Sequence, residues 1–236
     1  KSTMIDFNPQ RLTFNNADRY YIKRSIFQFL KSKFSLLQGE LLDIGCGEMP
    51  YKNEILKSTN VNKYVGLDIY GALEYKVGIE PDFFWDGKRM PFENESFNSG
   101  FATEVLEHCP DPMLTLNEIY RVLKPSSPLV LTVPFLWPTH ESPHDYFRYT
   151  PFAIEDLLKK AGFTNIEIVC LGGWDASLAQ MLSLWIKRRG FSIRYQKILY
   201  RLLSPFIKKL LRKDRIKPSN SDQIMFTSLG ILAWKK

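Results

Sequence analysis

One segment constrains the fold of this chain more than any other, the stretch ELLDIGCG at residues 40–47. A short apolar run that ends in a Gly-x-Gly turn before a helical pattern predicts a buried strand leading into a helix. Gly45 permits the sharp turn, and Gly47 lets backbone N–H groups approach a ligand near the helix N-terminus. Asp43, at the carboxyl end of the strand, is expected to face the same crevice. Because Pro50 stands where the dinucleotide pattern has its third glycine, the turn alone leaves cofactor binding and a plain tight turn open.

Two further apolar runs follow this turn and help to decide between cofactor binding and a plain tight turn. The first, residues 64–69, has the acidic Asp68 about 20 positions after the glycines, the offset at which a carboxylate meets the hydroxyls of a ribose. The second, residues 83–85, is followed directly by Asp86 and Gly87. This spacing favours a nucleotide-type cofactor over a plain turn.

Strands and helices alternate along the chain. Apolar runs predict strands at 98–103, 129–133, 166–171 and 224–234, and helices are expected at 50–58, 111–123 and 150–161. The pairs Asp111-Pro112 and Thr150-Pro151 place an N-cap residue before a proline at the first helical position. The alternation predicts a parallel, doubly wound sheet whose ligand crevice lies at the carboxyl ends of the strands. Residues 71–81 are expected to form a loop.

The N-terminal region divides into an arm and a helix. Residues 1–17 are polar and irregular and predict a loose arm. Apolar residues at helical spacing predict a helix over 18–37, with Asp18 as its N-cap. The helix is expected to pack on the edge of the sheet, and the alternative is that Arg19 or Tyr20 touches the ligand.

Length and composition limit the kind of protein. With 236 residues and 44% hydrophobic content, the chain can bury one sizeable core, and a single domain is expected. The three cysteines (Cys46, Cys109 and Cys170) have neither a disulfide framework nor metal-type spacing, which favours a reducing compartment. No apolar run approaches the ~18 residues that cross a bilayer. A cytoplasmic protein, soluble or peripheral on the inner face of the membrane, is expected.

The basic charge is concentrated in one segment. Residues 187–217 contain twelve Lys or Arg against Asp214 alone, whereas the whole chain has a net charge of +7. The remainder of the chain therefore has a net charge of −4. This asymmetry indicates a local anionic partner rather than a generally basic protein.

The basic segment belongs to an amphipathic insertion at 173–222. Apolar residues recur at helical spacing with Lys and Arg on the other side, and Ser204-Pro205 is expected to divide the segment into two helices. This composition fits a helix lying in a membrane interface, gaining about 1 kcal/mol per basic residue near anionic lipid. A core-facing or dimer-forming helix with a solvated basic side remains open. Nucleic acid is disfavoured because the aromatic residues are not interleaved as stacking platforms.

Five motifs together resemble class I S-adenosylmethionine (SAM)-dependent methyltransferases of the methyltransferase type 11 kind. They are DIGCG at 43–47, GLD at 66–68, MPFENESF at 90–97, EVLEH at 104–108 and RVLKP at 121–125. The resemblance covers about residues 40–171 in the family's order. It implies a Rossmann-like seven-stranded sheet, mostly parallel, whose last strand runs antiparallel at the edge. One methyltransferase domain, 1–236, then comprises an N-terminal arm and helix (1–38), a SAM-binding core (39–172), the insertion (173–222) and the last strand (223–236).

The resemblance also implies roles for individual residues. Gly45, Cys46 and Gly47 lie near the methionyl part of SAM, and Asp43 and Glu104 lie near its amino group. Asp68, followed by Ile69, holds the ribose hydroxyls, while Asp86 and Gly87 meet the adenine.

The three histidines provide the best evidence for acid–base chemistry. His108, His140 and His144 all follow predicted carboxyl ends of strands, and an alcohol becomes a good nucleophile when a base removes its proton. We expect His144 to be the base and His108 the second candidate.

Two further residues of the same block have expected roles. Asp145 is expected to orient a histidine, and Arg148 to hold an anionic group of the acceptor. The block HDYFRYT at 144–150 is similar to methyltransferases that accompany surface-polysaccharide synthesis.

The expected function is O-methylation of a sugar or lipid-linked glycan hydroxyl without a metal. Glu104, Glu107, His108 and His144 also look like the metal ligands of ubiquinone-pathway and small-RNA 2′-O-methyltransferases, so a quinone, other small-molecule or RNA methyltransferase with a divalent metal is an alternative. A catalytically silent binding subunit that docks through the basic helix is another. The acceptor is a small molecule or glycan, and a homodimer stays open.

Overall fold

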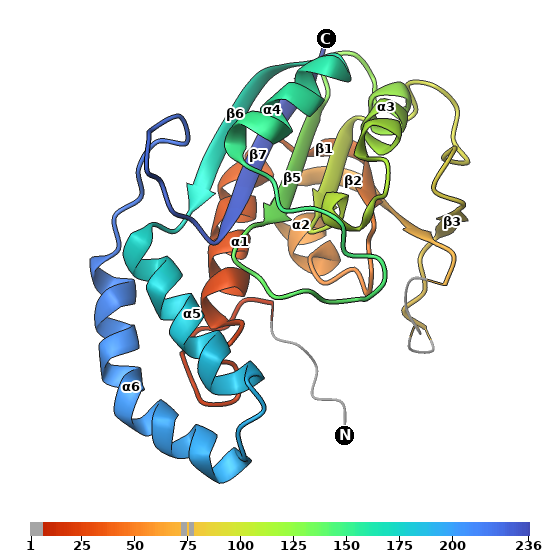
Figure 1. Ribbon diagram of the computed structural model, residues 1–236. Coiled ribbons are helices and arrows are strands. Elements are labelled where there is room, and N and C mark those ends of the chain that lie inside the picture. Colours follow the sequence, from red (N-terminus) through yellow and green to blue (C-terminus); the bar gives the residue numbers. More distant parts are fainter. Residues whose placement is uncertain (1–6, 72–74, 76–77) are drawn as a thin grey trace.

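The computed structural model describes residues 7–71, 75 and 78–236, which form one sheet covered by helices (Figure 1). The strands are β1 (Gln38–Ile44), β2 (Asn60–Ile69), β3 (Phe83–Trp85), β4 (Ser99–Thr103), β5 (Pro128–Pro134), β6 (Phe163–Leu171) and β7 (Ser228–Lys235). The helices are α1 (Tyr20–Lys33), α2 (Lys52–Ser58), α3 (Pro112–Val122), α4 (Pro151–Lys160), α5 (Trp174–Arg188) and α6 (Ile193–Lys213), with short 3-10 turns at Phe34–Leu36 and Leu106–His108. The expected strands and the helices at 50–58, 111–123 and 150–161 are all present, with ends shifted by a few residues. The expected loop at 71–81 lies partly outside the described residues.

The sheet order is β3-β2-β1-β4-β5-β7-β6, and the first five strands are parallel. The order reverses between β1 and β4, the place where open α/β sheets bind ligands beyond their strand ends. β7 runs antiparallel to both β5 and β6. The expectation that the last strand lies at the edge is wrong, because β7 is inserted between β5 and β6. β7 is buried along almost its whole length whereas β6 is half-exposed, so the more apolar strand takes the inner position.

Two apolar layers hold the sheet. α3 and α4 cover one face, where Leu116, Ile119, Ile154 and Leu158 pack on the strands. α1 and α2 cover the other face through Ile26, Leu30 and Ile55, among others. Each helix presents one apolar side, so both faces of the central strands are dry, as continuous apolar strands require. The Asp111 and Thr150 side chains cap α3 and α4 as the sequence predicts.

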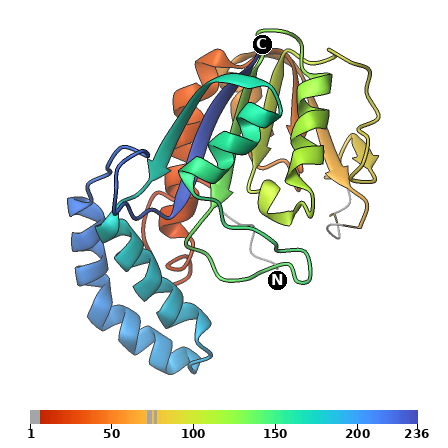
Figure 2. The same ribbon diagram turned by 45° about the horizontal axis from the view of Figure 1, so that its top comes forward.

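The insertion forms a helical hairpin of α5 and α6 that projects from the body (Figures 1 and 2). The expected division at Ser204-Pro205 is wrong, because α6 continues through Pro205 and the break between the helices falls at 189–192. Pro205 is exposed, so water solvates the carbonyl that its ring leaves unpaired. Apolar residues on both sides of the proline pack into the same cluster with α5, which keeps the two halves collinear.

The N-terminal arm is packed where the structure describes it. Phe7 contacts Tyr51 at a centroid distance of 5.7 Å, and Phe14 contacts Tyr200 at 5.7 Å, so residues 7–17 are not the loose arm expected. Residues 1–6 of that arm lie outside the described part.

Asp18 does not cap α1. Its carboxylate accepts a hydrogen bond of 2.8 Å from Arg188 Nε, which ties the start of α1 to α5. Within the described residues, none of the helices combines the length and apolarity needed to cross a bilayer.

Three substitutions test the continuity of α6. Ser192 caps α6 by accepting from the Tyr195 N–H, so Ser192→Ala is expected to lower the free energy of unfolding by about 1 kcal/mol. Ser204→Ala is expected to cause no loss, and Pro205→Ala to gain about 1 to 3 kcal/mol, because both positions are helix interior. Urea denaturation measures all three. A loss of stability in Ser204→Ala similar to that in Ser192→Ala would contradict a continuous α6 and support the predicted division at Ser204.

Candidate functional site

The glycine turn after β1 is fixed from two sides. Gly45 has a φ of +63°, and a Cβ at this position would lie 2.6 Å from Val105 Cγ2, which follows β4. Gly47 also has a positive φ, and its N–H donates to Asp68 Oδ2 of β2 at 3.0 Å. The turn is therefore held between the ends of β2 and β4, where the strand order reverses.

The Asp68 carboxylate contacts the turn, and its expected role in binding a ribose stays a prediction. Its Oδ1 accepts from the Ile69 N–H at 2.8 Å, and its Oδ2 accepts from the Tyr75 hydroxyl at 2.5 Å in addition to Gly47. The Tyr75 hydroxyl thus occupies a position on Asp68 that a ribose hydroxyl would take. A bound nucleoside has to share or displace this contact.

Asp43 and Cys46 are buried beside the turn. The Asp43 carboxylate accepts a hydrogen bond from the Tyr64 hydroxyl of β2 and is 2% exposed, so it is not open to the crevice as expected. Burial raises the pKa of Asp43 to about 8, against the opposing effect of the Tyr64 hydrogen bond. The Cys46 N–H donates to the carbonyl of Leu67 at 3.1 Å, and burial raises the pKa of its thiol. These two residues therefore hold the turn against β2.

The expected adenine residues lie at the end of β3. Asp86 Oδ1 accepts from the N–H groups of Lys88 and Arg89 at 2.9 and 3.2 Å, which lowers its pKa and shapes the following turn. Gly87 has a φ of +79°, and a Cβ here would approach Ile69 Cδ1 to 3.3 Å. Ile69 is 41% exposed and forms, with Gly87, an apolar edge beside Asp68.

Two acidic side chains lie beyond β4. Glu104 follows the strand in a left-handed conformation (φ +56°), and Glu107 lies in the next turn, fully buried. Neither Glu107 oxygen nor Glu104 Oε1 has a hydrogen-bond partner within the described residues. Burial raises the pKa of both carboxyl groups, and the negative charge of Glu104 raises that of Glu107 further. Unpaired buried carboxylates are costly, so this pair fits a cationic ligand.

Lys23 of α1 is a site residue that sequence reasoning missed. Burial raises the pKa of Glu104, and the positive charge of Lys23 is the largest effect that lowers it. Burial also lowers the pKa of Lys23 itself. The ammonium lies 4.3 Å from the ring centroid of Phe7. The alternative that the sequence leaves open is a ligand contact by Arg19 or Tyr20 at the start of this helix, whereas Lys23, one turn after Arg19, interacts with the carboxylates. A basic residue among the apolar positions of α1 is the only signal in the sequence.

The structure brings two histidines to the buried carboxylates. The His108 ring and the His140 ring have centroids 4.8 Å apart, and one ligand atom from each of Glu107, His108 and His140 lies within 4.8 Å of the others. His108 Nδ1 contacts the main-chain oxygen of His144 at 2.6 Å, so Nδ1 carries the proton and Nε2 is left as the acceptor. His144 contributes its backbone, and its exposed ring contacts the Tyr146 hydroxyl at 3.2 Å.

Asp145 and Arg148 hold the loop that carries these histidines. Arg148 donates to both Asp145 oxygens at 2.6 and 2.9 Å, which lowers the pKa of Asp145. Its remaining donors reach the carbonyls of Trp137, Pro138 and Phe147. Asp145 accepts from the His140 N–H at 3.0 Å, so it orients His140 rather than His144. Arg148 therefore stabilises the loop, and its expected contact with an acceptor stays a prediction.

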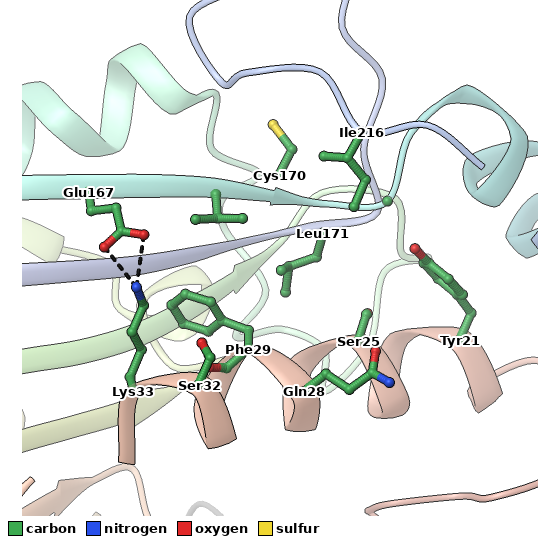
Figure 3. A pocket seen from close by; sticks show the side chains of 12 residues that line it. Tyr21, Ser25, Gln28, Phe29, Ser32, Lys33, Glu167, Cys170, Leu171 and Ile216 are labelled. Atoms are coloured by element: carbon green, nitrogen blue, oxygen red, sulfur yellow. Dashed lines mark hydrogen bonds and ion pairs between the residues drawn. The ribbon is translucent and has the colours of Figure 1, made fainter. Parts of the chain in front are cut away.

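Two grooves lie away from this crevice. The first, of about 310 Å³, runs between α1 and β6 and contains none of the predicted site residues; the Lys33–Glu167 ion pair closes one end (Figure 3). The second, of about 740 Å³, lies between α1, α6 and the N-terminal arm. The converging polar groups at the strand ends, and not these grooves, define the candidate active site.

A doubly wound sheet with a glycine turn, an aspartate at the end of the next strand and acid–base groups at its strand ends is the arrangement in which α/β proteins commonly bind nucleoside-containing cofactors. Residues 42–131 match the family model described as a methyltransferase domain. Over these residues the chain is similar to methyltransferase domains, and its fold is the Rossmann-like methyltransferase fold expected from the sequence.

Similar proteins and structures are also methyltransferases. The chain is 33% identical over 108 residues to sterol 24-C-methyltransferase ERG6 of Saccharomyces cerevisiae, covering 41% of this chain and 28% of that protein. It is 28% identical over 156 residues to O-methyltransferase rstn1 of Aspergillus nomiae, covering 57% and 69%. The structure of phosphoethanolamine N-methyltransferase 2 of Haemonchus contortus has a TM-score of 0.55 at 17% identity, covering 99% of this chain and 60% of that one. The chain thus spans less than a third of the yeast protein's length.

The contacts of Asp68 predict opposite effects of two substitutions. Asp68→Asn is expected to lower SAM affinity about 10- to 100-fold, because an ionised acceptor is lost. Tyr75→Phe is expected to raise SAM affinity up to about tenfold, because its hydroxyl no longer competes for Asp68. Isothermal calorimetry measures both, with Tyr70→Phe as control for the ring. Unchanged affinity in Asp68→Asn would remove this residue from the cofactor site.

The buried Asp43 predicts a pH-dependent stability. A carboxyl whose folded pKa is raised to about 8 stabilises the fold below its unfolded pKa near ~4, and this contribution is lost as pH rises through the folded value. The free energy of unfolding is expected to fall between these limits, and Asp43→Asn is expected to flatten the slope. Urea denaturation at stepped pH tests this, with Asp86→Asn as an exposed control. A slope unchanged in Asp43→Asn would contradict the assignment.

Proposed function

We propose that this chain is a methyltransferase that transfers the methyl group of SAM to a hydroxyl oxygen of a sugar or lipid-linked glycan. The observation that carries the proposal is the convergence of Glu107, His108 and His140 just after Val105, the residue that packs on Gly45. A hydroxyl acceptor needs a base, and a histidine with one ring nitrogen fixed by a carbonyl and the other left as acceptor provides it.

The residues at the strand ends fit the parts of the cofactor. Asp68 and the Ile69–Gly87 edge suit a ribose and an adenine, and the Gly47 turn gives close backbone approach. The orphaned Glu104 Oε1, a buried acceptor without a donor, suits an ammonium group such as the amino group of SAM. When bound, SAM supplies a methyl group already activated on a sulfonium, so the protein mainly aligns a nucleophile and holds the cofactor.

The geometry favours His108 over His144 as the base. The carbonyl of His144 accepts from His108 Nδ1, which leaves Nε2 to take the hydroxyl proton. Glu107 Oε1 and Glu141 Oε2 lie 3.7 and 3.6 Å from Nε2 and stabilise the imidazolium that forms. Asp145 positions the neighbouring His140 through its N–H. His144 stays a prediction as the second candidate, with a role through its backbone.

The region beyond β4 and β5, here called the acceptor side, has the chemistry of a site for a polar substrate. Carboxylates and imidazoles line the region beyond β4 and β5, where a sterol would need a large apolar pocket. The relative that is an O-methyltransferase is matched over a larger share of this chain than the sterol methyltransferase is. The segment 144–150 resembles methyltransferases of surface-polysaccharide synthesis, which supports a glycan.

A second candidate function is methylation of a vicinal diol, catechol or RNA 2′-hydroxyl with a divalent cation. The observation that favours it is the pair of unpartnered oxygens on Glu107, fully buried next to His108 and His140. These three residues would hold the ion, with His140 in place of the His144 of the expected set. A cation there would lower the pKa of a bound hydroxyl. His108 Nδ1 already contacts a carbonyl, the orientation that metal-binding histidines commonly have.

Substitution of the histidines tests the base. His108→Ala is expected to lower turnover ~10²-fold or more with nearly unchanged SAM affinity, because the base acts on the acceptor and not on the cofactor. His144→Ala is expected to lower turnover less, since its carbonyl remains. Methyl transfer from labelled SAM to cell-envelope glycans, followed by mass spectrometry for a 14-dalton increase, measures both. Equal turnover of His108→Ala and the unmodified protein would exclude His108.

Metal binding and SAM binding separate the alternatives. Calorimetry with Mg²⁺ and Mn²⁺ alone, on the chain and on Glu107→Gln, reports the cation site without activity; binding lost in Glu107→Gln supports the second candidate. Absence of SAM binding by the unmodified chain would overturn both enzyme proposals in favour of a silent binding subunit.

A further inference from the structure

The α5–α6 hairpin has an apolar surface that no described segment covers. Of the seventeen large apolar side chains exposed on the described residues, ten lie between 174 and 216. On α5 they recur every three or four residues, at Trp174, Leu178, Met181 and Trp185. On α6 they do the same, at Tyr195, Ile198, Leu202 and Phe206. This spacing places each set on one side of its helix.

The two stripes join at the hairpin turn into one surface. Phe191 contacts Trp185 at a centroid distance of 5.1 Å and Tyr195 at 5.1 Å, so the stripes lie on the same side of the hairpin. The opposite sides of the helices form their own cluster through residues such as Ala179, Ile186 and Ile207. The exposed stripes are therefore additional to the residues that hold the hairpin together.

Positive charge flanks the apolar surface. Arg194, Lys197, Arg201, Lys208 and Arg212 form a second stripe on α6, and the Arg189 guanidinium lies 5.7 Å from the Trp185 ring centroid. Asp214, the single acidic residue in 187–217, is turned inward, where it accepts from the N–H groups of Gly173 and Ala176.

The basic stripe also borders a groove. The groove of about 740 Å³ between α1 and α6 is lined by four basic residues, Arg11, Arg24, Lys208 and Arg212, and by one acidic residue, Asp214. Within the described residues none of these four side chains forms an ion pair, so the groove offers four free cationic groups to an anion.

The hairpin is braced against the acceptor side of the candidate active site. Arg188 Nη2 lies 2.7 Å from Asp18 Oδ2, and its guanidinium lies 5.7 Å from the Trp137 ring centroid. Trp137 belongs to the loop that follows β5 and leads to His140. Figures 1 and 2 show this green loop and the hairpin at the same end of the sheet.

We propose that the α5–α6 hairpin docks on the surface of an anionic lipid bilayer, with the apolar stripes in the interface and the basic stripe and groove on phosphate headgroups. Aromatic and aliphatic residues next to Lys and Arg fit this surface in both chemistry and charge. A second copy is disfavoured because a twofold contact would bring two strongly basic hairpins together. Nucleic acid offers phosphates but leaves aliphatic residues such as Leu178 and Leu202 without an apolar partner.

Docking would place the acceptor side of the crevice at the lipid surface. The inference that the acceptor is lipid-linked rests on the proposed function, whereas docking itself does not. Binding to vesicles is therefore measured without turnover, so that the two can fail separately.

Vesicle co-sedimentation of the full chain tests docking. Vesicles of phosphatidylcholine alone and with one-third phosphatidylglycerol are the probes, and preference for the anionic vesicles is expected. The variant Leu178→Gln/Leu202→Gln is expected to bind at least tenfold more weakly. Lys197→Gln/Arg201→Gln is expected to bind about 25-fold more weakly, from about fivefold per basic residue. Phe152→Gln on α4 and Lys57→Gln on α2, both exposed and outside the hairpin, are expected to bind as the unmodified chain does.

The unmodified chain provides a second measurement that needs no folded variant. Tryptophan fluorescence is expected to be quenched by dibrominated lipid in anionic vesicles, because Trp174 and Trp185 would enter the interface. No binding to anionic vesicles would overturn the proposal. So would a dimer whose mass is halved by Leu178→Gln/Leu202→Gln, or salt-sensitive RNA binding, in a chain without vesicle affinity.

Discussion

The hydrogen bond from the Gly47 N–H to Asp68 joins the turn after β1 to the end of β2, and the remainder of the site depends on it. The turn packs so closely on β2 that a Cβ at Gly66 would lie 2.9 Å from Met49 Sδ and 3.0 Å from Cys46 Sγ. On the other side, Gly45 lies against Val105, directly after β4. Because β1 pairs in parallel with both β2 and β4, these contacts fix the turn at the point where the strand order reverses. This geometry brings the glycine turn, Asp68 and the residues after β4 together at one end of the sheet.

The acidic residues beyond β4 lower the stability of the fold. Glu107 is fully buried, neither of its oxygens has a hydrogen-bond partner among the described residues, and the charge of Glu104 raises its pKa, so the native fold contains two desolvated carboxyl groups that repel each other when both are ionised. Lys23 offsets part of this cost from α1. A protein selected for stability alone would replace such groups with apolar ones, since burying polar atoms without partners is unfavourable. Under the proposed function, a cationic ligand group or a proton that arrives with the reaction would offset this cost.

The sequence predicts the central sheet well because local signals agree there with tertiary structure. Alternating runs, caps at Asp111 and Thr150, and glycines at 45 and 47 each determine their own neighbourhood. The position of β7 inside the sheet, the continuity of α6 through Pro205 and the pairing of Asp18 with Arg188 depend on contacts between distant segments, which local propensity does not report. The same limit applies to the site. The sequence favours His144 and His108 and indicates no role for His140, and only the folding of the loop brings His140, rather than the His144 ring, to Glu107.

The charge distribution relates the proposed docking surface to the candidate active site. The segment 187–217 has eleven more positive than negative charges, whereas the rest of the chain has a net charge of −4. An anionic surface therefore attracts the hairpin and repels the remaining surface, which orients the molecule before contact as well as binding it, within about one Debye length of ~10 Å. Since Arg188 braces α5 against the start of α1 and against Trp137, that orientation is transmitted to the loop that holds His140. A membrane-linked hydroxyl would then meet the crevice from the side on which the acid–base groups lie, without any need for the acceptor to leave the lipid.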